Sequence, residues 1–232
     1  MPPLIAQTAK RLLLPVTVLF GVMVGLGLLV TRVVDHAWPL TAEDDLNRSL
    51  EANRDAPLNV ISEIVSLIGS TPVIIAVTGV AAFILRVKLG RWREPLFLCL
   101  GVTAQALVFF FTTLVINRER PGVHRMDDSP PTSSFPSGHT SAAVALYVGL
   151  ALLLFTLLRR TWAKRVAWLL VLIPVGVAFA RMYRGMHHPT DVTASFLNGI
   201  TCVAIMARQI LNRAVDWVVP QRLRAGRQRV AH

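Results

Sequence analysis

The stretch PLFLCLGVTAQALVFFFTTLVIN, Pro95–Asn117, decides the fold class of this chain. None of its residues is Asp, Glu, Lys or Arg. A helix needs about 20 mainly apolar residues to cross a hydrocarbon core of roughly 30 Å. The stretch therefore predicts a membrane-spanning helix.

Other apolar runs are also long enough to span a membrane: Leu12–Thr31, Leu58–Leu85, His139–Leu158, Ala163–Tyr183 and Thr190–Leu211. Of the 232 residues, 53% are hydrophobic and only 16% are charged, too few for the surface of a soluble domain. The first run is too long for a signal peptide, and no small-residue cleavage site follows it. We expect an all-α fold, a six-transmembrane-helix bundle that forms a single domain over residues 1–215, with a basic tail over 216–232.

The basic residues predict the orientation of this bundle. The net charge is +11, and most Lys and Arg residues fall near the chain ends and in the connections that follow the second and fourth runs. Because short cytoplasmic loops collect positive charge, we expect both termini to be cytoplasmic and the acidic connection 32–57 to lie outside. The charge then reflects topology and attraction to anionic lipid, not nucleic-acid binding. Cys99 and Cys202 lie inside apolar runs, which predicts packing and no disulfide.

The first polar motif of the predicted outer face is NRERP, Asn117–Pro121. Arg118 and Arg120 follow the apolar run directly, and Pro121 stops a helix. Interfacial arginines that extend toward water would explain this pattern. A guanidinium also binds two phosphate oxygens at once, which an ammonium cannot do. On this fragment alone, both interpretations stay open.

The second motif is PSGH, Pro136–His139, at the start of the fourth run. Ser137 is a good N-cap residue, and Gly138 fits beside it without steric strain. A helix N-terminus offers unpaired N–H groups and partial positive charge, so it can bind an anion. Capping explains Ser137 and Gly138 but leaves His139 unexplained, at the rim of such an anion site.

The third motif is ARMYRGMHHPTD, Ala180–Asp191, which links the last two runs. Pro189 favours a helix start, so Asp191 falls in the first turn. Asp191 can then accept a hydrogen from one ring nitrogen of His187 and leave the other nitrogen free to attack, as in nucleophilic sites.

Metal binding is the alternative interpretation of this histidine-rich region. His139, His187, His188 and Asp191 are all residue types that ligate metals. Neighbouring His187 and His188 point in different directions, however, and the nearby arginines would repel a cation. We therefore expect no metal, and a solvated interfacial position for His188. The loop residues His124, Arg125, Asp127 and Asp128 are expected to be ordinary, or at most a substrate rim.

Together, the segments Arg120-Pro121, Pro136-Ser137-Gly138-His139 and Arg181-x5-His187-x3-Asp191 resemble the three-part signature of the type-2 phosphatidic acid phosphatase superfamily. This family includes membrane lipid phosphatases and is related to vanadium haloperoxidases. The resemblance covers residues 113–191 directly, and the six-span plan extends it over most of the chain. It implies a phosphatase that needs no cofactor.

The resemblance also implies a role for each matching residue. His187 would be the nucleophile that forms a phosphohistidine, and Asp191 would hold it in the reactive tautomer. His139 would protonate the leaving lipid oxygen and later activate water. The phosphoryl oxygens would be bound by Arg120, Arg181, Ser137 and the Gly138 amide.

Two positions depart from the family pattern. Thr113 stands where the family has Lys, and Ala180 stands where Ser is frequent. On a continuous helix, Thr113, Asn117 and Arg120 would share a face toward the site. Arg118 is a candidate substitute for the missing charge, and Arg184 is a further candidate phosphate ligand. These departures bear on phosphate affinity or substrate choice more than on mechanism.

The sequence thus predicts an integral-membrane lipid phosphatase of the plasma membrane with an extracytoplasmic site. Its partners would be membrane lipids and not nucleic acid. The substrate would be a polyprenyl diphosphate, which is favoured slightly, phosphatidic acid or phosphatidylglycerol phosphate. Two alternatives stay open: a lipid headgroup or phosphoryl transferase on the same scaffold, and a non-catalytic lipid-binding or transport protein.

Overall fold

A computed structural model describes residues 2–33, 40–128 and 132–212 of the chain. All regular elements in these ranges are helical. Six helical stretches are long and apolar enough to cross a membrane: Arg11–Val33, Thr71–Leu89, Arg93–Val115, Gly138–Leu157, Thr161–Tyr183 and Pro189–Leu211. The predicted all-helical fold with six spans is therefore confirmed, and the chain is a multi-pass membrane protein. The basic tail predicted for 216–232 lies outside the described residues.

Several spans are built from more than one helical segment. The α-helices are α1 (Pro2–Leu28), α2 (Leu40–Ala52), α3 (Ala56–Ile68), α4 (Thr71–Leu89), α5 (Arg93–Val115), α6 (Gly138–Ala143), α7 (Gly149–Leu157), α8 (Thr161–Trp168), α9 (Leu172–Tyr183) and α10 (Pro189–Met206). The π-helical segments Leu29–Val33, Val144–Val148 and Ala207–Asn212 extend α1, join α6 to α7 and extend α10, and the 3₁₀ turn Leu169–Val171 joins α8 to α9.

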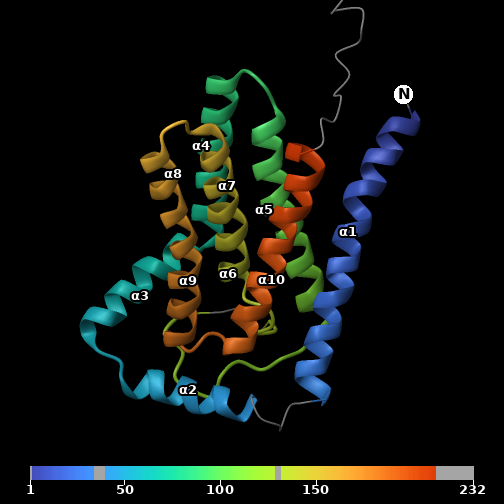
Figure 1. Cartoon of the computed structure of the whole chain (residues 1–232). Coiled ribbons are helices and arrows are strands. Elements are labelled where there is room, and N and C mark those ends of the chain that lie inside the picture. The colour runs from blue at the N-terminus through green and yellow to red at the C-terminus, as the bar shows by residue number, and fades with distance from the viewer. Residues whose placement is uncertain (1, 34–39, 129–131, 213–232) are drawn as a thin grey trace, which may run out of the picture.

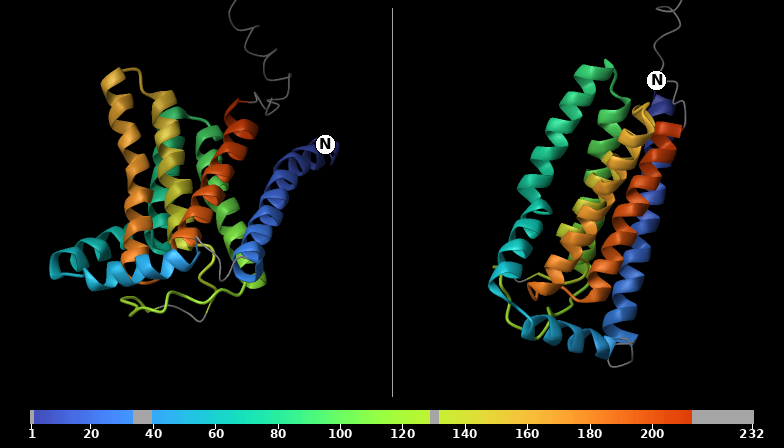
Figure 2. Two further views of the ribbon diagram at one scale, coloured as in Figure 1. Left: turned by 60° about the horizontal axis from the view of Figure 1, so that its bottom comes forward. Right: turned by 60° about the vertical axis from the view of Figure 1, so that its left-hand side comes forward.

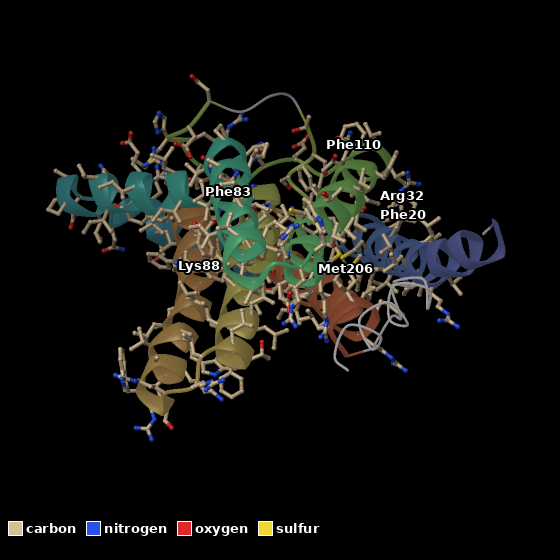
Figure 3. All side chains as sticks on the ribbon, turned by 90° about the horizontal axis from the view of Figure 1, so that it is seen from above. Phe20, Arg32, Phe83, Lys88, Phe110 and Met206 are labelled. Atoms are coloured by element: carbon tan, nitrogen blue, oxygen red, sulfur yellow. The ribbon has the colours of Figure 1, made fainter. Side chains whose placement is uncertain are left out.

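The bundle has an apolar core and many large apolar side chains on its outer surface. α5 and α10 pack against each other, and both also contact α1 and α6. Large apolar side chains such as Phe83 and Phe110 are 70% and 53% exposed and lie at the periphery of the bundle (Figure 3). A water-soluble protein rarely exposes so much contiguous apolar surface, whereas hydrocarbon solvates it.

The second predicted span, 58–85, is wrong as one continuous helix, because the run divides into α3 and α4 at Gly69 and Ser70. Pro72 stands in the first turn of α4 and has no N–H to donate to the carbonyl of Ile68. That carbonyl accepts from the hydroxyl of Tyr147 instead, at 3.2 Å. A Cβ on Gly69 would lie 2.7 Å from Cγ1 of Val177 and 3.2 Å from the carbonyl oxygen of His139, so the break packs tightly against α9 and α6.

Helices α2 and α3 gather at one end of the bundle. α2 lies across the ends of the spans, and α3 leans outward from the same end (Figure 1, Figure 2). The first residues of α1 and the last turn of α10 lie at the opposite end (Figure 1).

α3 presents a polar stripe to the protein and an apolar face outward. Ser62 and Ser66 are buried, whereas Ile61 and Ile64 are more than half exposed. Asn59, Ser62 and Ser66 are spaced three and four residues apart, which places them on one face of the helix. This face packs against α9 and receives hydrogen bonds from Tyr183, Arg184 and Arg181.

Candidate active site

The three sequence motifs meet at the α2 end of the bundle. The connection between α5 and α6 is held in place by backbone hydrogen bonds from Ser134 N to Arg118 O, 2.9 Å, and from Met126 N to Arg184 O, 3.1 Å. The first bond joins the two ends of this connection. The second attaches its middle to the turn between α9 and α10. Residues from α5, α6, α9 and α10 are thereby brought to one place.

The PSGH segment forms a helix start, as its residue types predict. Ser137 has an extended backbone, and its hydroxyl accepts from Thr140 N at 3.5 Å and from Thr140 Oγ1 at 3.0 Å. Its own N–H donates to Ser195 Oγ of α10 at 2.7 Å. Ser137 is thus fully buried between α6 and α10, where it fixes the helix start. Gly138 meets the ring of Phe109, whose Cζ would lie 2.8 Å from an added Cβ.

A cavity of about 750 Å³ lies beside this helix start. At one end it is lined by His139, His187, Arg120, Arg181 and Gly138. The rest of its wall comes mainly from apolar residues of α4 and α5, which include Ile74, Ile75, Val102, Ala106, Leu107, Phe109 and Phe110. Its size suits a small-molecule ligand. One cavity therefore joins a cluster of histidines and arginines to an apolar groove between two spans.

His187 is buried at the polar end of the cavity, and its orientation is fixed by the backbone. Its Nδ1 lies 2.8 Å from the carbonyl oxygen of Ser134. Since a carbonyl only accepts, Nδ1 carries the hydrogen, and the lone pair is on Nε2. Burial lowers the pKa of His187; Asp191 opposes this effect, and the charges of Arg181 and Arg120 add to it. The neutral imidazole is thus favoured, with Nε2 available as a nucleophile.

The expected hydrogen bond between Asp191 and His187 is too long, because Oδ2 of Asp191 lies 3.7 Å from Nδ1. Both carboxylate oxygens already have donors. Oδ2 accepts from the backbone N–H of His188 at 2.8 Å, and Oδ1 accepts from Arg118. Asp191 therefore acts on His187 through its charge and by capping α10, while the Ser134 carbonyl fixes the tautomer. Sequence reasoning missed Ser134, since a carbonyl leaves no side-chain signal.

Two arginines, Arg120 and Arg181, line the cavity. Arg120 donates to the carbonyl oxygen of Met186 at 2.8 Å, and burial lowers its pKa with a further contribution from Arg125. Arg181 donates through one nitrogen to Ser66 Oγ and to Asp127 Oδ2, at 2.9 and 2.6 Å. Its Nε is buried and has no partner within the described part of the chain, and the residue lines the cavity.

The other candidate residues are placed differently from the predicted arrangement. α5 ends at Val115, so Thr113, Asn117 and Arg120 do not share a helical face. The Thr113 hydroxyl donates back to Phe110 O of its own helix, at 2.8 Å. Asn117 and Arg118 line a separate polar pocket of about 390 Å³, which shares Arg120 with the cavity. Arg118 is therefore not placed as a substitute for the family's Lys.

Asp127 is a residue whose contacts the sequence did not predict. Its Oδ2 accepts a hydrogen bond from Arg181, and its Oδ1 accepts one from Nε of Arg184 at 2.8 Å. Burial alone would raise the pKa of Asp127, but the hydrogen bond from Arg184 and the charges of both arginines hold it below its ordinary value. Arg184 is thus engaged by Asp127 and by α3, and it supports Arg181.

His188 is also placed differently from the solvated position expected for it. Its side chain is buried, with Nδ1 3.3 Å from Asp191 Oδ2. Among the described residues, no three His, Cys, Asp or Glu side chains are grouped as metal ligands. Cys99 and Cys202 are free thiols, as expected from their positions in apolar runs.

The chain is similar to two proteins of Bacillus species. It is 30% identical over 127 residues to undecaprenyl-diphosphatase BcrC of Bacillus subtilis, which covers 51% of this chain and 61% of that relative. It is 30% identical over 80 residues to the bacitracin transport permease protein BcrC of Bacillus licheniformis, 34% of this chain and 35% of that one. The chain thus matches less than two thirds of the length of either relative.

Solved structures share the fold. A transmembrane PAP2-type phosphatidylglycerolphosphate phosphatase from Bacillus subtilis superposes with a TM-score of 0.67 at 23% identity, covering 84% of this chain and 94% of that one. Aquifex aeolicus LpxE gives a TM-score of 0.56 at 23% identity, over 71% and 93% of the two chains. The sequence profile of the PAP2 superfamily matches residues 73–214, more than half of the chain and all three motifs. By this match, the chain belongs to the PAP2 superfamily.

Proposed function

We propose that this protein is a lipid phosphatase that hydrolyses a phosphomonoester or diphosphate of a membrane lipid. The cavity carries the proposal: two histidines and two arginines close one end of it, and apolar side chains of α4 and α5 line the remainder. A ligand that fits both ends has an anionic headgroup and a hydrocarbon tail. Arginine forks recognise phosphoryl oxygens, while a groove between spans lets the tail stay in the membrane.

In the proposed mechanism, Nε2 of His187 attacks the terminal phosphorus, and the P–N bond forms as the bond from that phosphorus to the leaving oxygen breaks. The leaving oxygen belongs to the lipid alcohol of a phosphomonoester, or to the lipid monophosphate that departs from a diphosphate. His139 gives its proton to that oxygen. His139 then takes a proton from water, whose oxygen attacks phosphorus and breaks the P–N bond, so inorganic phosphate leaves. Arg120, Arg181 and the Gly138 amide stabilise charge on the transferring group, which is the main requirement of phosphoryl transfer.

The proposed substrate is a polyprenyl diphosphate, with hydrolysis at the outer leaflet of the plasma membrane. The relative that is named an undecaprenyl-diphosphatase supports this choice. The arginine-rich connections support cytoplasmic termini, and the α2 end would then face outward, because the first residues of α1 lie at the opposite end. A cysteine introduced at Asp128 should react with a membrane-impermeant reagent in intact cells.

Phosphate release by the purified protein tests the activity. The substrates are a polyprenyl diphosphate, phosphatidic acid and phosphatidylglycerol phosphate in detergent micelles. We expect release to be fastest with the diphosphate, to be abolished by His187→Ala, and to be inhibited by vanadate, which mimics pentacoordinate phosphorus. Activity that survives His187→Ala would exclude the phosphohistidine mechanism. Phosphate transferred to an added alcohol, with none released in its absence, would identify a transferase.

A further inference from the structure

Glu43 of α2 is buried at the N-terminus of α10, although α2 is otherwise mostly exposed. Glu43 is 5% exposed, and its Oε1 accepts from the backbone N–H of Thr190 at 2.7 Å. Its Oε2 accepts from the Thr190 hydroxyl at 3.0 Å. The first N–H groups of a helix have no partner within the helix and favour negative charge. Glu43 therefore caps α10 from a different element.

Arg118 lies between Glu43 and Asp191 and contacts both carboxylates. Its Nη2 is 2.8 Å from Oε2 of Glu43, and its Nη1 donates to Oδ1 of Asp191 and, at 2.7 Å, to Thr190 Oγ1. Only 12% of the Arg118 side chain and 6% of the Glu43 side chain are exposed. Solvent therefore screens these charges weakly, and each charge acts strongly on the next.

Glu43, Arg118 and Asp191 form a series of alternating charges that ends at His187. Asp191 is fully buried, and its Oδ2 lies 3.7 Å from Nδ1 of His187. A negative Asp191 favours a proton on His187. Arg118 offsets that effect, and Glu43 in turn offsets Arg118. The signs alternate along the series, so the removal of Glu43 and the removal of Arg118 have opposite consequences at the imidazole.

From this arrangement we infer that Glu43 and Arg118 are positioning residues: they hold Asp191 and the first turn of α10 beside His187 and set the electrostatic field at its ring. The inference rests on the proposed function, in which His187 is the nucleophile. Glu43 lies outside residues 73–214, the segment that matches the family profile, so this part of the site belongs to a helix that the family match does not include.

Substitution of Glu43 or Arg118 leaves the other charged groups near His187 unchanged. Arg181 of α9, Arg120 of the α5–α6 connection and Asp191 of α10 all act on its pKa, and His139 of α6 lines the same cavity. Asp127 acts indirectly, through its ion pair with Arg181. Differences between variants and wild type therefore report the substituted charge together with any change it causes in the placement of Asp191.

The test compares Glu43→Gln, Arg118→Gln and the double variant with wild type. Asp45→Asn and Arg48→Gln are matched controls, because this exposed pair on α2 undergoes the same charge changes. The measurement is the pH dependence of kcat/KM for phosphate release, whose acid limb reports protonation of the nucleophile in the free enzyme. Melting temperature is recorded for each variant.

We expect the acid limb of Arg118→Gln to move up by about one pH unit, since an uncompensated Asp191 attracts the proton across a poorly screened distance. Glu43→Gln should move it down, because Arg118 then offsets Asp191 more fully. The acid limb of the double variant should lie between those of the two single variants, and the acid limbs of both controls should match that of wild type. Shifts in the same direction, or no shift in either variant, would overturn the inference.

A second measurement does not require activity. Titration of ¹³C-labelled histidine by NMR, with the His187 signal assigned by its loss in His187→Ala, gives the protonation of the ring in each variant. If wild type releases no phosphate from any lipid phosphate, the proposed function fails, and the NMR shifts still decide the positioning role. If Arg118→Gln does not fold, Glu43→Gln against Asp45→Asn decides it, since a downward shift is required.

Discussion

The carbonyl oxygen of Ser134 lies 2.8 Å from Nδ1 of His187 and is better placed to accept from it than Asp191 is, whose Oδ2 is 3.7 Å away. The carbonyl belongs to a connection whose ends are joined by the hydrogen bond from Ser134 N to Arg118 O. The tautomer of His187 is thus fixed by the backbone of this connection. Asp191 supplies charge and caps α10, and its removal would leave the ring oriented.

The placement of His187 predicts the pH dependence of the enzyme. Because burial lowers the pKa of His187, the ring stays neutral as pH falls below the ordinary histidine value of about 6.5, and activity is lost only at lower pH. The acid limb of kcat/KM should therefore lie below pH 6.5 or so. If the acid limb falls at the same pH with a monoester and with a diphosphate substrate, it reports a group of the enzyme and not a group of the substrate. A limb well above pH 7 would contradict a buried neutral nucleophile.

Asp127 predicts a coupled effect on stability and activity. Its carboxylate pKa is held below the ordinary value, so it stabilises the fold at neutral pH, and this stabilisation is lost as pH falls through the lowered pKa. We expect Asp127→Asn to cost about 2 kcal/mol, as for hydrogen bonds to a charged group. The loss should appear as a drop of several degrees in Tm at pH 7 that shrinks below about pH 4 and vanishes only once pH has fallen below the lowered pKa of Asp127.

The same substitution should weaken catalysis, because Asp127 orients Arg181 toward the cavity. A roughly tenfold or greater loss in kcat/KM is expected from a misplaced phosphate ligand. Glu63→Gln on the exposed face of α3 is the control and should match wild type. An Asp127→Asn protein with a lowered Tm and unchanged kcat/KM would reduce Asp127 to a structural residue.

The sequence was sufficient for the spans and for the grouping of the motifs, but not for the contacts within the site. An apolar run of about 20 residues satisfies its backbone hydrogen bonds in a membrane by forming a helix, which is why the six spans were predictable. The role of Glu43 was not predictable, because it is one of several acidic residues in its connection. Only its burial against Thr190 distinguishes it. Asp127 likewise has the sequence context of an ordinary loop residue, and only its contacts with Arg181 and Arg184 distinguish it.

The break between α3 and α4 did have a signal in the sequence. Pro72 lies four residues after Ile68, so its ring forbids the helical bond to that carbonyl. A proline in the first turn of a helix favours a new start at Ser70 or Thr71 over a continuous span. The mean hydropathy of the whole run, by contrast, predicts a single span. The error matters, since the break contacts His139.

Gly69 is predicted to be required for the geometry of His139. A Cβ at this position would lie 2.7 Å from Val177 and 3.2 Å from the His139 carbonyl oxygen, so Gly69→Ala must separate α3 from α6 and α9. We expect kcat to fall about tenfold or more as the acid is displaced. Gly79→Ala in α4 is the matched control, because no atom lies within 4 Å of its added Cβ. Equal activity of both variants would contradict the close approach.

The groove between α4 and α5 predicts a length-dependent effect on substrates. Ala106 lines the groove and is exposed on α5, so Ala106→Trp should obstruct a long hydrocarbon tail. Activity on a polyprenyl diphosphate should fall, while activity on a short-chain, water-soluble phosphate should not. Ala76→Trp, at an exposed position of α4 outside the groove, is the control. Equal losses on both substrates would argue against tail binding between these helices.

Gln105 predicts opposite effects on stability and substrate binding. It is 3% exposed, and its Oε1 is buried with no hydrogen-bond partner in the described ranges, yet the residue lines the cavity. An unsatisfied buried polar group costs about 1–3 kcal/mol, so Gln105→Leu should raise Tm by several degrees. If the amide contacts the polar part of the lipid next to the reacting phosphate, KM should rise as well. Asn198→Leu, which removes the donor to the Gln105 backbone carbonyl, should instead lower Tm. A higher Tm with an unchanged KM would show that Gln105 does not contact the substrate.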